Sequence, residues 1–114
     1  MMLPKNGKLL RIFIGESDKR DGVPLYEWIV RRARELGLAG ATVLRGLEGF
    51  GAQSRLHTAK ILRLSSDLPI VVEIVDTDEK IEAFLPEVDD AIAEGLATVE
   101  RVEIRLYRSR QAAD

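Results

Sequence analysis

Hydrophobic and polar residues follow strand-like spacing in four stretches of this chain. Residues 8–16 (KLLRIFIGE) are rich in Leu, Ile and Phe and end beside a glycine, which predicts a strand buried on at least one face. Residues 41–47 also have strand character. Residues 68–75 (LPIVVEIV) predict the strongest strand because β-branched side chains dominate them. In residues 97–107, hydrophobic and polar residues alternate with one slip in phase near Arg101, as in a strand with one solvent-exposed face.

A first amphipathic helix is predicted between the first two of these strands. Residues 17–22 (SDKRDG) form a polar turn before it. Pro24 suits the first helical position, because its missing N–H needs no partner there. Apolar residues then recur at helical spacing on one side, and Gly37 ends the pattern.

A second amphipathic helix is predicted after the strongest strand. Asp76 or Thr77 can cap its N-terminus, and Glu79 is placed to close a capping box onto Asp76. Pro86 lies inside the pattern, so we expect a kink or a restart of the helix at that point. Gly95 is expected to end it.

The predicted order of elements is β-α-β-β-α-β, with residues 55–64 as a short strand or an arm between the middle strands. Right-handed crossovers then give an α+β, ferredoxin-like fold, with a four-stranded antiparallel sheet and two helices on one face. The whole chain, 1–114, is expected to be a single domain, with residues 1–7 and 108–114 as flexible ends.

Composition excludes several classes of protein. The chain has 114 residues and no cysteine, which excludes a disulfide scaffold, thiolate zinc sites and cysteine nucleophiles, and fits a cytoplasmic location. We see neither a signal peptide nor an apolar run long enough for membrane insertion. The net charge of −2 gives no overall attraction to nucleic acid, although residues 45–63 are basic and residues 73–94 acidic.

Catalytic motifs are also missing from the sequence. There is no H-E-x-x-H motif, no P-loop and no nucleophile set of the Ser-His-Asp type, and His57 is the single histidine. We therefore expect a binding protein rather than an enzyme, and no metal site.

A glycine cluster is the most unusual local feature. Gly46, Gly49 and Gly51 crowd the chain around Phe50, which suits a bulge, a bend or a ligand that approaches the backbone closely. Gly49 and Gly51 could offer bare N–H groups to a phosphate or a base, or simply bend the strand. Phe50 could cover a base, or pack in the core or a subunit interface.

Charged residues supply the other candidates. Arg45, Arg55 and Arg105 have the guanidinium geometry that binds phosphate, although most arginines are ordinary surface charges. His57 could sense pH, pair with phosphate or ligate a metal, or be a plain loop residue. Glu73 could face a cleft or lie on the wet face of the sheet.

Two motifs carry a resemblance to a known family. Residues 37–43 (GLAGATV), followed by residues 49–53 (GFGAQ), resemble the stretch that leads into the T-loop of the PII signalling proteins. From KLLRIFIGESDK through GLAGATVLRGLEGFGAQSRLHTAKI to LPIVVEIVDT, nearly the whole chain resembles an uncharacterised PII-like family. The resemblance places Gln53 at a PII position that contacts effectors and metal, and Arg105 at a C-terminal PII position.

The resemblance implies a homotrimer with its sheets packed inward and small effectors in clefts between subunits. AMP, ADP or ATP is the implied effector, and the arm would signal to a partner protein. Residues 93–98 (AEGLAT) lack the lysine of the PII phosphate loop, which favours a mononucleotide or diphosphate over a triphosphate. The alternative is a trimeric interaction module without a small ligand. The expected ligand-binding residues are Arg45, Gly49, Phe50, Gly51, Gln53, Arg55, Glu73 and Arg105, and the expected partner-binding residues are Arg55, His57, Lys60 and Arg63.

Overall fold

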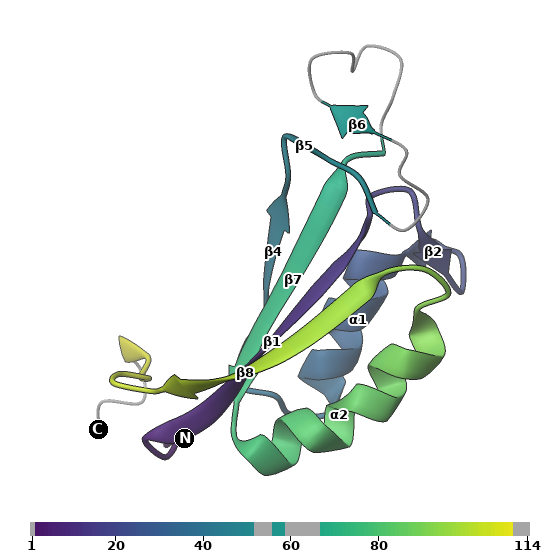
Figure 1. Cartoon of the computed structure of the whole chain (residues 1–114). Coiled ribbons are helices and arrows are strands. Elements are labelled where there is room, and N and C mark those ends of the chain that lie inside the picture. Colours follow the sequence, from purple (N-terminus) through teal and green to yellow (C-terminus); the bar gives the residue numbers. More distant parts are fainter. Residues whose placement is uncertain (1, 52–55, 59–66, 111–114) are drawn as a thin grey trace.

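Four strands and two helices form the body of the protein in the computed structural model, which describes residues 2–51, 56–58 and 67–110. Strands β1 (Asn6–Gly15), β4 (Thr42–Arg45), β7 (Pro69–Asp76) and β8 (Leu96–Glu103) build one sheet in the order β4-β7-β1-β8. Every neighbouring pair is antiparallel. This arrangement confirms the ferredoxin-like α+β fold that the sequence predicts (Figure 1).

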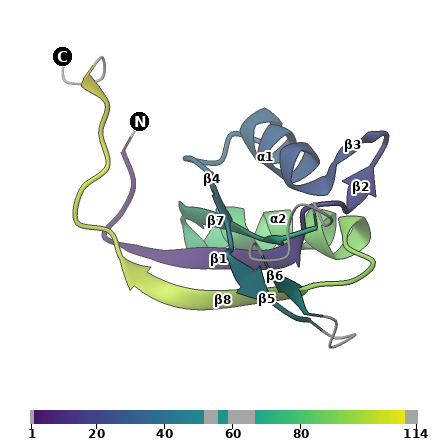
Figure 2. The same cartoon turned by 90° about the horizontal axis from the view of Figure 1, so that it is seen from above.

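Both helices cover the same face of the sheet (Figure 2). Helix α1 (Leu25–Glu35) follows β1 and α2 (Asp78–Ala91) follows β7. Alternate residues of the two central strands point toward the helices and are buried, because successive side chains of a strand point to opposite faces. The core consists of Leu10, Ile12 and Ile14 of β1, Ile70, Val72 and Ile74 of β7, and Leu25, Ile29, Ala33, Ile81, Phe84 and Val88 of the helices.

Two small ribbons extend this body. The first joins β2 (Lys19–Arg20) to β3 (Val23–Pro24) through Asp21 and Gly22, which both have positive φ, at 52° and 81°. Such a turn suits the right-handed twist of a hairpin, and Asp-Gly is its usual sequence. The second ribbon pairs β5 (Glu48–Gly49) with β6 (His57–Thr58) and projects beyond the end of β7 (Figure 1).

The start of α2 confirms Thr77, one of the two caps expected from the sequence, but not the expected capping box. Thr77 is the N-cap, and its hydroxyl oxygen accepts a hydrogen bond from the Lys80 N–H. The residue three positions after this cap is Lys80 rather than Glu79, so the expected capping box onto Asp76 was wrong. The Asp76 carboxylate is buried instead and accepts hydrogen bonds from the N–H groups of Ala39 and Thr77.

Prolines and strand ends account for the other differences. Pro24 is the N-cap of α1 rather than its first helical residue. Helix α2 continues through Pro86 without a restart and ends at Ala91, before Gly95. Strand β1 begins at Asn6, so it includes the last two residues of the end expected to be flexible.

The described part of the chain contains no helix with the length and apolar character needed to cross a membrane.

Candidate functional site

A cleft of about 550 Å³ lies where the loop after α1 meets the C-terminal segment that follows β8. Residues 39–42 form one wall and residues 102–107 form the other. Leu9, Glu73 and Val75 come from the two central strands, and Leu3 comes from the N-terminal segment. A largely apolar cleft of this size with a few polar groups is typical of a small-molecule site.

The loop wall is held in place by side chains from other elements. The Ala39 N–H donates to the buried Asp76 carboxylate over 2.8 Å. On the other side of the same residue, the Ala39 carbonyl accepts a hydrogen bond from the Tyr107 hydroxyl over 2.7 Å. The Lys80 ammonium donates to the Gly37 carbonyl over 2.8 Å. The loop therefore has a fixed shape at the edge of the cleft.

Glu73 contributes a carboxylate that is already engaged. The Arg11 guanidinium donates to Glu73 over 2.7 Å and to Glu100 over 2.9 Å. The hydrogen bond that Arg11 donates to Glu73 is the main cause that raises the pKa of Arg11 above its usual value. Arg11, which Glu73 shares with Glu100, compensates part of the negative charge of Glu73. The cleft is therefore less unfavourable to an anion than it would be with an unpaired carboxylate.

Arg105 is the cationic side chain among the residues that line the cleft. It is 82% exposed and lies 3.4 Å from Glu103, so its ion pair is weak and solvent-screened. Its guanidinium can turn toward an anion in the cleft at little cost. Within the described residues, no three His, Asp or Glu side chains gather to hold a metal ion.

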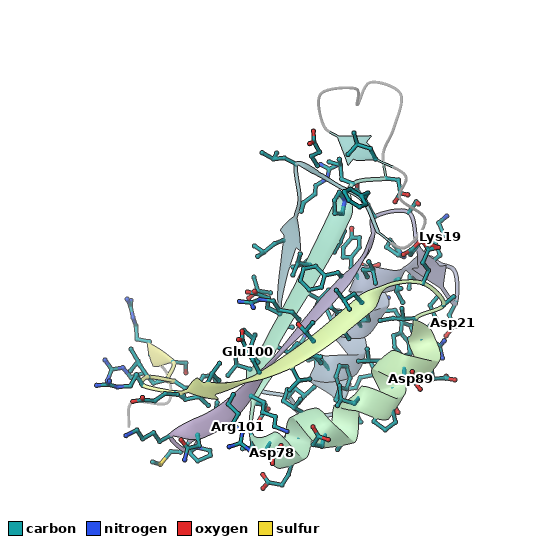
Figure 3. All side chains as sticks on the ribbon, in the orientation of Figure 1. Lys19, Asp21, Asp78, Asp89, Glu100 and Arg101 are labelled. Atoms are coloured by element: carbon teal, nitrogen blue, oxygen red, sulfur yellow. The ribbon has the colours of Figure 1, made fainter. Side chains whose placement is uncertain are left out.

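The sheet face opposite the helices is uncovered and carries an apolar row. Leu44, Val71, Phe13 and Leu96 lie directly across from one another on the four strands. Phe13 is 37% exposed, Leu44 48% and Leu96 58%. The next row holds Glu73 and Arg11, and Figure 3 shows Glu100, their ion-pair neighbour, on β8. A contiguous exposed row of this kind marks an interaction surface.

The structure places the sequence-predicted candidates in two groups. Glu73 and Arg105 line the cleft. Arg45 is the last residue of β4 and residues 49–51 lie beyond it, away from the cleft residue Thr42 at the start of the strand. The Arg45 guanidinium donates to Glu16 over 3.0 Å.

The glycine cluster has a local packing role at two of its positions. A Cβ on Gly46 would lie 3.2 Å from the Pro69 side chain, and one on Gly49 would lie 3.0 Å from it. These glycines therefore allow the chain to pass closely over Pro69. A Cβ on Gly51 would meet nothing within 4 Å, and Phe50 is 71% exposed.

The remaining candidates belong to the arm. His57 lies in β6, where its backbone pairs with Gly49. The other four, Gln53, Arg55, Lys60 and Arg63, lie outside the described residues.

Apart from Glu73 and Arg105, the residues that line the cleft were not among the sequence-predicted candidates. Residues 40–42 belong to the GLAGATV motif, which carried the family resemblance but gave no sign that these residues line a cleft. Tyr107 closes the cleft by contacting a loop 68 residues away, and no local pattern signals such a long-range contact. The sequence signal for this role was that Tyr107 is an aromatic residue at the end of the last predicted strand, residues 97–107.

Comparison with sequence families and curated proteins finds clear relatives. Residues 7–104 match the family DUF190, described as "Uncharacterized ACR, COG1993". A UPF0166 protein of Aquifex aeolicus (strain VF5) is 45% identical over 97 residues, which cover 85% of this chain and 91% of that protein. A UPF0166 protein of Methanocaldococcus jannaschii is 36% identical over 85 residues, which cover 75% and 78% of the two chains.

Solved structures with the same fold include CPII, a nitrogen regulatory PII-like protein from Thiomonas intermedia K12. One CPII structure, bound to ADP, AMP and bicarbonate, has a TM-score of 0.61 and is 18% identical, covering 87% of this chain and 88% of that one. Another, bound to ADP and bicarbonate, has a TM-score of 0.58 and is 20% identical, with the same coverage. At 18–20% sequence identity, this structural similarity shows that the protein shares the fold of CPII.

Proposed function

This chain belongs to the DUF190 family and has the fold of PII-like proteins, and from these premises we propose that it is a PII-like regulator that binds an adenine nucleotide. The cleft between residues 39–42 and 102–107 is the observation that carries the proposal. Its apolar surface suits a purine ring, and its one cation suits a phosphate. The nucleotides bound to the CPII structures support the same ligand class.

The number of cations in the cleft favours a ligand with few negative charges. Arg105 is the cation of the lining, whereas Glu73 and Glu103 are carboxylates. One guanidinium can bind one phosphate in a bidentate manner. We therefore rank AMP and ADP above ATP as effectors of a single protomer's cleft.

A homotrimer is part of the proposal. The uncovered face with Phe13, Leu44, Val71 and Leu96 would be covered if three copies packed their sheets inward. Leu9, Glu73 and Val75 of the cleft point to this same face, because they alternate with the buried residues of β1 and β7. Packing of the sheets would thus bring a second copy near each cleft.

The arm is the proposed contact with a partner protein. The β5–β6 ribbon projects from the body and joins it beside the close passage of Gly46 and Gly49 over Pro69. Arg55, His57, Lys60 and Arg63 keep their proposed role in partner binding, and the cytoplasmic location expected from the sequence also remains a prediction. The proposed activity is regulated binding rather than catalysis.

Thermal unfolding with AMP, ADP, ATP and simple dicarboxylates tests this function. A ligand present at one hundred times its Kd should stabilise the native state by about 2.7 kcal/mol. Arg105→Ala should weaken nucleotide binding by about tenfold or more, because it removes a charged hydrogen-bond donor. Arg101→Ala, which changes another exposed arginine of the same chain segment, is the matched control and should bind as wild type does.

Two results would contradict the proposal. If none of these ligands changed the unfolding temperature, the interaction module without a small ligand would become the better account. If Arg105→Ala and Arg101→Ala bound the nucleotide equally well, the phosphate would lie somewhere other than in this cleft.

A further inference from the structure

The C-terminal wall of the cleft is loosely attached to the body of the protein. Strand β8 ends at Glu103, and beyond it the chain leaves the sheet (Figure 2). The Ile104 N–H still donates to the Lys5 carbonyl. Leu106 is then 65% exposed, and Arg105 extends into solvent. Little apolar burial therefore stabilises residues 104–107, and they belong to the part of the fold that opens most easily.

One hydrogen bond joins this wall directly to the opposite one. The Tyr107 hydroxyl donates to the Ala39 carbonyl over 2.7 Å. Tyr107 and Ala39 both line the cleft. The bond therefore spans the cleft at its edge, from the C-terminal segment to the loop after α1.

The loop side of this contact is the fixed side. Ala39 is anchored by its N–H to Asp76, whose side chain is buried between the sheet and the start of α2. The same loop is anchored again through the hydrogen bond from Lys80 to Gly37. When the bond between Tyr107 and Ala39 breaks, the C-terminal segment is the wall that moves.

We infer that Tyr107 is a latch that holds residues 104–107 as a closable strap across the cleft. A ligand that contacts both walls stabilises the closed strap, and by thermodynamic linkage the latch tightens binding of that ligand by the same factor. Tyr107 is thus a positioning residue, which acts through the strap that carries Arg105. The coupling to ligand rests on the proposed nucleotide site, whereas the latch itself does not.

Hydrogen exchange of the full-length protein tests the latch without any ligand. Tyr107→Phe removes the hydroxyl and keeps the ring, so amides of residues 104–110 should exchange about three- to tenfold faster, as expected for one lost hydrogen bond. Exchange in β1 and β7 should stay unchanged, which distinguishes a local opening from general destabilisation. Tyr26→Phe is the matched control, because the Tyr26 hydroxyl makes no hydrogen bond within the described residues.

A titration of both variants with ADP tests the coupling. Tyr107→Phe should raise the Kd for ADP by at most the same three- to tenfold factor, because the apparent Kd depends on the fraction of free protein with the strap closed. Tyr26→Phe should leave the Kd at the wild-type value. Unchanged exchange of residues 104–110 in Tyr107→Phe would overturn the latch. Exchange of residues 104–110 that saturating ADP did not slow in the wild type or in Tyr107→Phe would overturn the role of the strap at the cleft. If wild type bound no nucleotide, the proposed function would fail, and the exchange measurement would still decide whether the latch exists.

Discussion

At the scale of single residues, an ion pair joins the two helices. Arg32 of α1 donates to Glu87 of α2 over 2.7 Å. The hydrogen bond from Arg32 is the main cause that lowers the pKa of Glu87 below its usual value of 4.5. Because the folded-state pKa is the lower one, this carboxylate stabilises the fold above pH about 4.5, and the contribution disappears as the pH falls through the folded-state pKa.

Glu87→Gln should therefore lower the unfolding temperature at neutral pH and have no effect in acid. The difference in unfolding temperature between the wild type and the variant should shrink steadily as the pH falls below about 4.5. Thermal unfolding, monitored by circular dichroism at a series of pH values from neutral to acid, measures this difference. Asp89→Asn, at an exposed position of the same helix (Figure 3), is the control and should show a much smaller gap at neutral pH. A gap for Glu87→Gln that persisted unchanged in acid would contradict an electrostatic origin.

At the scale of elements, the sequence predicted the main strands and helices because burial repeats along them. Residues 70, 72 and 74 of β7 are buried in strict alternation, which the run of β-branched residues reflects. The ends of the helices were harder to predict, because helix caps depend on contacts with residues distant in sequence. Asp76 resembles a helix cap locally, yet its carboxylate binds Ala39, and only the folded structure brings that loop to it.

The continuity of α2 through Pro86 shows tertiary packing overriding a local preference. Phe84 and Val88, on either side of the proline, are both buried, and their packing offsets the cost of the missing hydrogen bond. Pro86→Ala should therefore stabilise the protein by about 1–3 kcal/mol, because it restores an N–H donor at an exposed position within the helix.

Chemical denaturation measures that change in the free energy of unfolding. Pro4→Ala, at an exposed position before β1, is the control for the loss of a proline and should alter stability little. Equal or lower stability of Pro86→Ala would mean that the proline imposes a geometry on α2 that the packing needs.

At the scale of the whole molecule, the proposed trimer depends on the uncovered sheet face. Phe13 lies at the centre of the apolar row, so Phe13→Glu should separate the proposed trimer into monomers of 12.7 kDa, as light scattering after gel filtration would show. A charge there would remain unpaired in the interface. Leu36→Glu, at an exposed position after α1, should leave the trimer intact. A wild-type protein that is monomeric at all concentrations would contradict the assembly.

The candidate site was only partly predictable from the sequence. Glu73 and Arg105, two of the ligand-binding residues expected from the sequence, lie at the cleft. The resemblance to PII proteins had favoured Arg105, and the strand position of Glu73 allowed it to face a cleft. The sequence alone leaves the role of the glycine cluster open, since a close passage over Pro69 and a ligand contact both favour glycine. The contact of Tyr107 with Ala39 depends on how two segments distant in sequence come together in the fold. No spacing of residues along the chain predicts that contact.

The most direct test of the central claim is amide chemical-shift mapping of the wild-type protein during a titration with ADP. We predict that the largest shifts fall in residues 39–42 and 102–107, on both walls of the cleft. Residues 49–51, beyond the far end of β4, should shift less. Shifts confined to residues 49–51 would move the ligand to the glycine cluster, and no shifts at saturating ADP would contradict nucleotide binding itself.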